Sequence, residues 1–88
     1  MFFKKKSKSP VEILFREYEA EVKKAIKETP IDLNNPMAGV LVLGIIANLK
    51  KASIQDASNL SIYFSLSEME TEATIDLAID KVKNKYLK

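Results

Sequence analysis

The chain of 88 residues contains no cysteine and no histidine. These absences exclude disulfide bridges, thiolate and imidazole metal ligands, and catalysis by a cysteine or histidine nucleophile. They also remove the side chain that acts most often as a general base near neutral pH. A chain of this length buries only about 60 to 65% of its unfolded surface, so we expect apolar packing, completed by a second copy, to stabilise it.

Glycine is also scarce, and its two positions exclude a phosphate-binding loop. Neither Gly39 nor Gly44 is followed by the Lys-Ser/Thr pair that such a loop requires. A catalytic pair of carboxylates would need a cleft that so small a helical domain hardly builds. We therefore expect a protein that is not an enzyme and that carries no cofactor.

Charge is distributed unevenly along the chain. Residues 1–8 carry four lysines and no acid, which leaves ten basic and twelve acidic side chains in the remainder. Residues 52–80 contain six acidic side chains and no basic one. We interpret residues 1–8 as a basic N-terminal arm and residues 9–88 as one mildly acidic domain.

The first residues do not resemble a secretory signal. The basic start runs directly into a charged amphipathic segment instead of an apolar stretch with a cleavage site. The longest apolar run, Met37 to Ala47, is shorter than the roughly 20 residues that span a bilayer. We expect a soluble, cytoplasmic protein.

The first predicted helix covers residues 10–28. Ser9, Pro10 and Glu12 form a capping-box pattern, and Pro30 ends the segment. We expect ion pairs between Glu12 and Arg16, and between Glu19 and Lys23, on its outer face. Apolar residues at spacings of three and four predict one buried stripe: Val11, Leu14, Phe15, Tyr18, Val22, Ala25 and Ile26.

The second predicted helix covers residues 36–51. Asn35-Pro36 is a typical helix start, and the segment is apolar nearly all round until Lys50 and Lys51, so we expect it to be buried centrally. A buried strand is the alternative, because the segment is rich in β-branched residues and contains two glycines. Gly39, Gly44 and Ala47 would allow another backbone to approach closely, either within the chain or from a second copy.

Residues 54–65 fit two patterns. Ile54, Ala57, Leu60 and Phe64 fit one helical face, whereas Leu60, Ile62, Phe64 and Leu66 alternate with polar residues and Tyr63 as in a half-buried strand. We predict a third helix here. If both ambiguous segments were strands, the fold would be α-β-β-α.

The last predicted helix covers residues 68–86 and starts at a second capping box, from Ser67 to Glu70. Two apolar stripes predict packing against two neighbours: Ile75, Ala78, Ile79, Val82 and Tyr86 form one, and Leu66, Met69, Ala73 and Leu77 form the other. The predicted fold is an all-α bundle of about four helices.

An acidic strip formed by Glu72, Asp76 and Asp80 is the first candidate site. These carboxylates recur every four residues and so lie along one side of the last helix. Like charges at this spacing destabilise a helix, which favours an interaction role. A basic protein partner is the functional interpretation that we keep for the strip. A divalent cation is another, and an ordinary acidic helix start accounts for the same pattern without any function.

The basic arm is the second candidate site. It combines two aromatic side chains with four ammonium groups: Phe2, Phe3, Lys4, Lys5, Lys6 and Lys8. Such a segment suits an anionic membrane surface or the phosphates of nucleic acid, and a solubilising tail is the alternative. From these patterns we expect a small protein-binding accessory or regulatory domain, with another protein or a second copy as partner. A nucleic-acid-associated or membrane-surface protein acting through the arm is the alternative.

Overall fold

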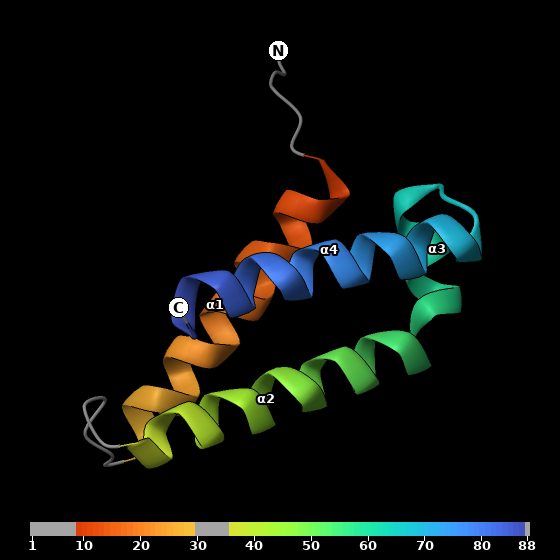
Figure 1. Cartoon of the computed structure of the whole chain (residues 1–88). Helices are drawn as coiled ribbons and strands as arrows, with labels where there is room; N and C mark the ends of the chain where they lie inside the picture. Colours follow the sequence, from red (N-terminus) through yellow and green to blue (C-terminus); the bar gives the residue numbers. More distant parts are fainter. Residues whose placement is uncertain (1–8, 30–35, 88) are drawn as a thin grey trace.

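The computed structural model describes residues 9–29 and 36–87, and this part of the chain is a bundle of four helices without a strand (Figure 1). The helices are α1 (Pro10–Glu28), α2 (Pro36–Gln55), α3 (Ala57–Phe64) and α4 (Glu68–Tyr86). The all-α prediction is confirmed, and the α-β-β-α alternative is wrong for these residues. Asn35, the predicted cap of α2, and the basic arm lie outside the described residues.

Both predicted Ser caps start their helices, but of the two predicted capping boxes only the one at Ser67 is complete among the described residues. The hydroxyl of Ser9 accepts a hydrogen bond from the backbone N–H of Glu12 at 3.2 Å, and Pro10 occupies the first turn of α1. At α4 the capping box is complete, because Ser67 accepts from the N–H of Glu70 while the Glu70 carboxylate accepts from the N–H of Ser67. These local bonds satisfy backbone donors that a helix start leaves free.

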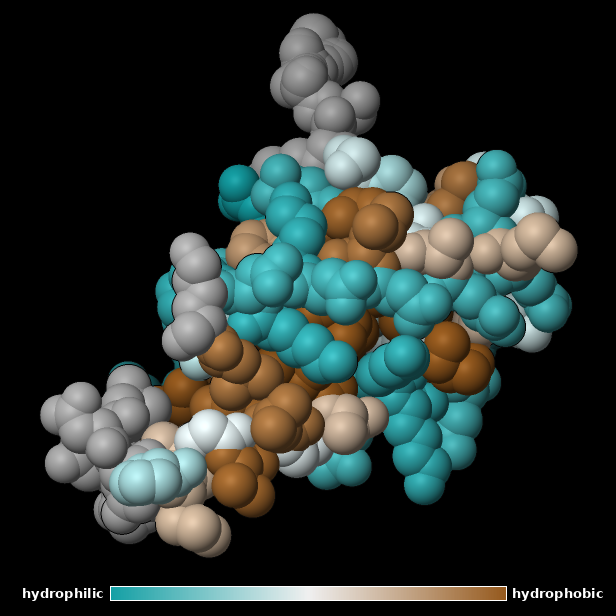
Figure 2. Space-filling model, viewed as in Figure 1, coloured by the Kyte–Doolittle hydropathy of each residue, from teal (hydrophilic) through white to brown (hydrophobic). Residues whose placement is uncertain are grey.

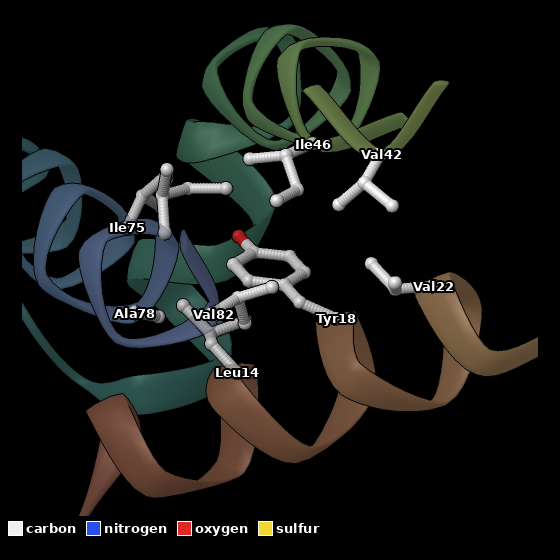
Figure 3. Packing of buried hydrophobic residues seen from close by; sticks show 9 residues of the cluster. Leu14, Tyr18, Val22, Val42, Ile46, Ile75, Ala78 and Val82 are labelled. Atoms are coloured by element: carbon white, nitrogen blue, oxygen red, sulfur yellow. The ribbon is translucent and has the colours of Figure 1, made fainter. Parts of the chain in front are cut away.

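The core lies where α1, α2 and α4 meet (Figure 3). Its fully buried members include Val22, Ile46, Ile75 and Val82, and α1 and α4 share the most extensive contact in the bundle. Two threonines are also buried on α4. The hydroxyls of Thr71 and Thr74 each donate to the backbone carbonyl four residues earlier, at 2.8 Å, so their burial leaves no polar group unsatisfied.

One predicted ion pair forms and the other does not. Arg16 pairs with Glu12 at 3.5 Å, as expected on the outer face of α1. Glu19 was expected to pair with Lys23, but its carboxylate is mostly buried beside α4 and pairs with Lys85 there. The expectation was wrong because spacing within a helix does not show which neighbouring helix supplies a closer cation.

The C-terminal end of α2 and the start of α3 differ from the prediction. α2 continues past Lys50 and Lys51 to Gln55, so Ile54 belongs to α2 and not to the third helix. The break falls at Asp56, whose N–H is shared between the carbonyls of Ala52 and Ser53, both at 3.1 Å. No glycine or proline lies near this break to indicate it, so its position could not be read from the sequence.

The second apolar stripe predicted for α4 is also wrong. Met69 and Leu77 are 82% and 56% exposed, although packing against a second neighbour was expected for their stripe. The side chains that α4 buries cover one broad side of the helix, because α1, α2 and α3 all contact it there: Thr71, Thr74, Ile75, Ala78, Ile79 and Val82.

Candidate functional site

α2 departs furthest from the sequence prediction, because it was expected to be buried centrally and is not. Only Ala38, Val42 and Ile46 are buried, and they recur every four residues along one narrow stripe. The other helices cover α2 from one side only. The opposite side is therefore open to solvent, although most of its residues are apolar.

We call this open side the α2 face. It consists of Met37, Val40, Leu43, Gly44, Ala47 and Ile54. Met37, Val40 and Leu43 are 59%, 60% and 50% exposed, and the shorter side chain of Ala47 is also exposed. Figure 2 shows brown, apolar side chains gathered over α2 beside the teal, polar surface of α4. Exposed apolar patches of this kind mark surfaces that contact a protein or a membrane.

The two glycines of α2 are not used for close packing within the described chain. A Cβ atom built at Gly39 or at Gly44 meets no atom of the described residues within 4 Å. Both positions cost a helix about 1 kcal/mol relative to alanine, and no close contact from another part of the described chain requires glycine at either position. Of the two explanations for the small residues, packing within the chain is therefore excluded for the described residues.

The acidic strip lies on α4 next to α2. Glu72, Asp76 and Asp80 are all exposed, and Asp76 pairs with Lys50 of α2 through an Oδ1 to Nζ distance of 3.4 Å. Since both side chains are about half exposed, such a pair contributes little stability. No group of three or more acidic side chains able to hold a metal ion forms among the described residues. The strip therefore meets the edge of α2 through Asp76.

A shallow groove of about 230 Å³ lies between α1, α2 and α3. Its lining includes Leu14, Leu49 and Leu60, and the carboxylates of Glu17 and Glu21 lie at its α1 side. Tyr18 and Ser53, also in the lining, form a 2.6 Å hydrogen bond with each other. The pKa of Tyr18 is raised, mainly by burial and to a smaller degree by the nearby Glu17 carboxylate. The hydrogen bond with Ser53 acts in the opposite direction and lowers the pKa. Because these two hydroxyls bond to each other, the groove offers a ligand fewer polar contacts than its lining suggests.

Among the described helices, α2 alone is long enough and apolar enough to cross a membrane, judged by length and composition only. The apolar run from Met37 to Ala47 is too short by itself, but the helix continues through Ala52 to Ile54 with only Lys50 and Lys51 charged. The buried stripe of α2 packs in the core with α1 and α4.

The α2 face was only partly predicted from the sequence. Gly44 and Ala47 were recognised as points of close approach, but the large side chains around them were assigned to the core. A signal was present: residues 37, 40, 44, 47, 51 and 54 follow the alternating three-and-four spacing of a helix-pairing seam.

Comparisons with protein-family models, with curated proteins and with solved structures found no match to this chain.

Proposed function

We propose that this chain is a non-enzymatic, protein-binding accessory or regulatory domain of the cytoplasm, and that the α2 face is its contact surface. The observation that carries the proposal is the exposure of Met37, Val40 and Leu43 on a single side of one helix. The partners that fit such a surface are another protein or a second copy of this chain.

The exposed area is large enough to matter energetically. Full burial of an aliphatic side chain or a methionine contributes about 1.5 to 3 kcal/mol. Met37, Val40 and Leu43 are each 50 to 60% exposed, so covering the rest contributes about 1 kcal/mol per residue. This gain favours a partner that covers all three residues together.

The surroundings of the α2 face resemble the anatomy of a protein interface, in which polar residues surround an apolar centre. The acidic strip borders one edge through Asp76, and Lys50 and Lys51 lie towards the C-terminal end of α2. Within this proposal, Glu72, Asp76 and Asp80 give the rim a negative charge that selects for basic residues beside an apolar centre on the partner.

A membrane-surface protein is the second candidate, favoured by the length and apolar composition of α2. Here the α2 face would lie on the bilayer, and the basic residues of 1–8 would add attraction to anionic lipids. Nucleic-acid binding through residues 1–8 stays a prediction from the sequence, and a mobility shift that weakens with salt and with deletion of these residues tests it.

The test compares three forms of the full chain used as bait: wild type, Val40→Glu and Ile62→Glu. The control position, Ile62, is 77% exposed on α3, away from the α2 face. The bait is incubated with a lysate that contains a differently tagged copy of the chain, and retained proteins are identified by mass spectrometry. The proposal predicts a protein retained by wild type and Ile62→Glu and lost from Val40→Glu.

Two results would contradict the proposal. One is the absence of any retained protein that depends on Val40. The other is co-sedimentation with anionic vesicles that Val40→Glu abolishes and Ile62→Glu does not, which would assign the α2 face to a membrane.

A further inference from the structure

We propose, on the basis of the proposed function, that the partner of the α2 face is a second copy of this chain, with the two α2 helices packed antiparallel about a two-fold axis. Six positions of α2 would form the contact, and we call them the α2 seam: 37, 40, 44, 47, 51 and 54. Successive positions are separated by three and four residues in alternation, the spacing at which one helix faces another along its length.

The α2 seam is complementary to itself when inverted. About a centre between Gly44 and Ala47, an antiparallel copy places Met37 opposite Ile54, Val40 opposite Lys51, and Gly44 opposite Ala47 of the other copy. Large residues meet near both ends and the two small residues meet in the middle, where they allow the backbones to approach. A flat bilayer surface does not require such a central notch.

Charge selects the antiparallel direction. α2 contains two lysines and no acidic residue. A parallel pair would bring Lys51 of both copies together across an interhelical distance of about 8 to 10 Å. The antiparallel pair separates them by about 16 Å along the axis, at 1.5 Å per residue, which is about twice the screening length at physiological salt. The aliphatic stem of Lys51 can cover Val40 of the other copy while its ammonium group reaches water.

The fold leaves room for this arrangement. The buried stripe of α2, with Val42 and Ile46, packs against the rest of its own bundle, and the α2 seam lies on the opposite side of the helix. The two bundles would therefore lie on opposite sides of the helix pair without meeting. A helix of 20 residues is about 30 Å long and about 10 Å wide, so the pair buries about 300 Å² of each copy. The total of about 600 Å² is well below the about 1,200 Å² at which stable interfaces begin, so we expect a weak, reversible dimer.

The first measurement is sedimentation of the full chain over an about hundredfold range of concentration. Wild type and Ile62→Glu should shift from one copy to two as the concentration rises. Val40→Glu should remain a single copy over the same range, with the helical circular dichroism of wild type, because Val40 is 60% exposed. Wild type that stays monomeric throughout overturns the proposal, as does a dimer that Val40→Glu leaves intact.

The second measurement fixes the direction of the helices. Because the chain has no cysteine, Val40→Cys and Lys51→Cys can be prepared as single-thiol proteins. A short bismaleimide should join Val40→Cys to Lys51→Cys when the two are mixed, and should join neither variant to itself. Cross-linking of Lys51→Cys to itself without the mixed product would indicate a parallel pair and overturn the antiparallel arrangement.

The two levels of the account can fail separately. A monomeric wild type whose bait still retains another protein through Val40 would overturn the dimer and support the proposed function. A monomeric wild type with no Val40-dependent protein would overturn both. The last outcome is a wild type that both dimerises and binds anionic vesicles, with the vesicle binding lost in Val40→Glu. This result would overturn the assignment of the α2 face to a second copy alone.

Discussion

At the scale of single residues, two tyrosines show how differently a buried hydroxyl can be treated. Tyr18 is 4% exposed and lies among the core side chains (Figure 3). Its hydroxyl lies 2.6 Å from that of Ser53, so it joins α1 to α2. The hydroxyl of Tyr86 is buried without a hydrogen-bond partner among the described residues. Burial raises the pKa of both phenols. Only one of the two hydroxyls therefore has an interaction that offsets its desolvation.

We expect opposite effects from removing the two hydroxyls. Tyr18→Phe breaks the link to Ser53 and should lower the free energy of unfolding by about 1 kcal/mol. Tyr86→Phe removes a polar atom that lost its hydration without a compensating bond. This change should raise the free energy of unfolding by about 1 kcal/mol. Urea unfolding of both variants checks this, and equal effects of the same sign would show that the two hydroxyls are equivalent.

Glu70 provides a pH dependence of known sign. Hydrogen bonds with Ser67 lower the pKa of the Glu70 carboxyl below the usual 4.5. The bond from the Ser67 backbone N–H has the largest effect, and the bond with the Ser67 side chain adds to it. Since the folded state holds the charged form, this stabilisation is present above pH 4.5 and is lost as the pH falls through the folded pKa.

Glu70→Gln serves as the comparison for this effect, because glutamine can still accept from the Ser67 N–H but cannot ionise. We expect the stability difference between wild type and Glu70→Gln to be larger at pH 7 than at pH 3 in urea titrations. A difference that is constant with pH would contradict the assigned interaction.

At the scale of helices, local signals in the sequence predicted more than hydrophobicity did. The starts of α1 and α4 follow from serine caps, which act within four residues and need no tertiary contact. The extent to which α2 is buried could not be predicted from such local signals, because the number of neighbours that cover a helix is a property of the whole fold. An apolar sequence shows that a surface avoids water, but it does not show whether the same chain or another one covers it.

The end of α3 is a place where the chain accepts local strain. Ser65 caps the helix with φ 58° and ψ 44°, the left-handed conformation that glycine adopts without cost. The N–H of Leu66 then bonds to the carbonyl of Ser61 at 2.9 Å. Ser65→Gly should therefore raise the free energy of unfolding by about 1 kcal/mol, whereas Ser65→Ala should not. Thermal unfolding of both variants checks this, and no gain with glycine would contradict it.

The two glycines of α2 provide a matched pair of variants. Gly39→Ala and Gly44→Ala each add a methyl group that meets nothing within 4 Å of the described chain, and each should stabilise the helix by about 1 kcal/mol. Only Gly44 belongs to the α2 seam. We therefore expect Gly44→Ala to weaken self-association in sedimentation and Gly39→Ala to leave it unchanged.

Equal association of both glycine variants would contradict the assignment of Gly44 to the contact. A loss of stability in either variant would instead indicate a contact within the chain.

At the scale of the whole molecule, the bundle divides into a polar outer surface on α4 and an apolar one on α2 (Figure 2). The acidic strip was predicted from the four-residue spacing of its carboxylates, and that spacing places them on one side of α4. Its position beside α2, with Asp76 next to Lys50, could not be predicted because it depends on how the two helices pack. The candidate residues of the basic arm lie outside the described structure, so their role stays a prediction.

The central claim is that a second copy of the chain covers the α2 face, and thiol accessibility tests it most directly. Ala47→Cys places one thiol on the α2 face, and Ala73→Cys places one at an exposed alanine on α4 as a matched control. The account predicts that maleimide labelling of Ala47→Cys slows as the protein concentration rises, while labelling of Ala73→Cys does not change. Labelling of both thiols at the same rate at every concentration would contradict it.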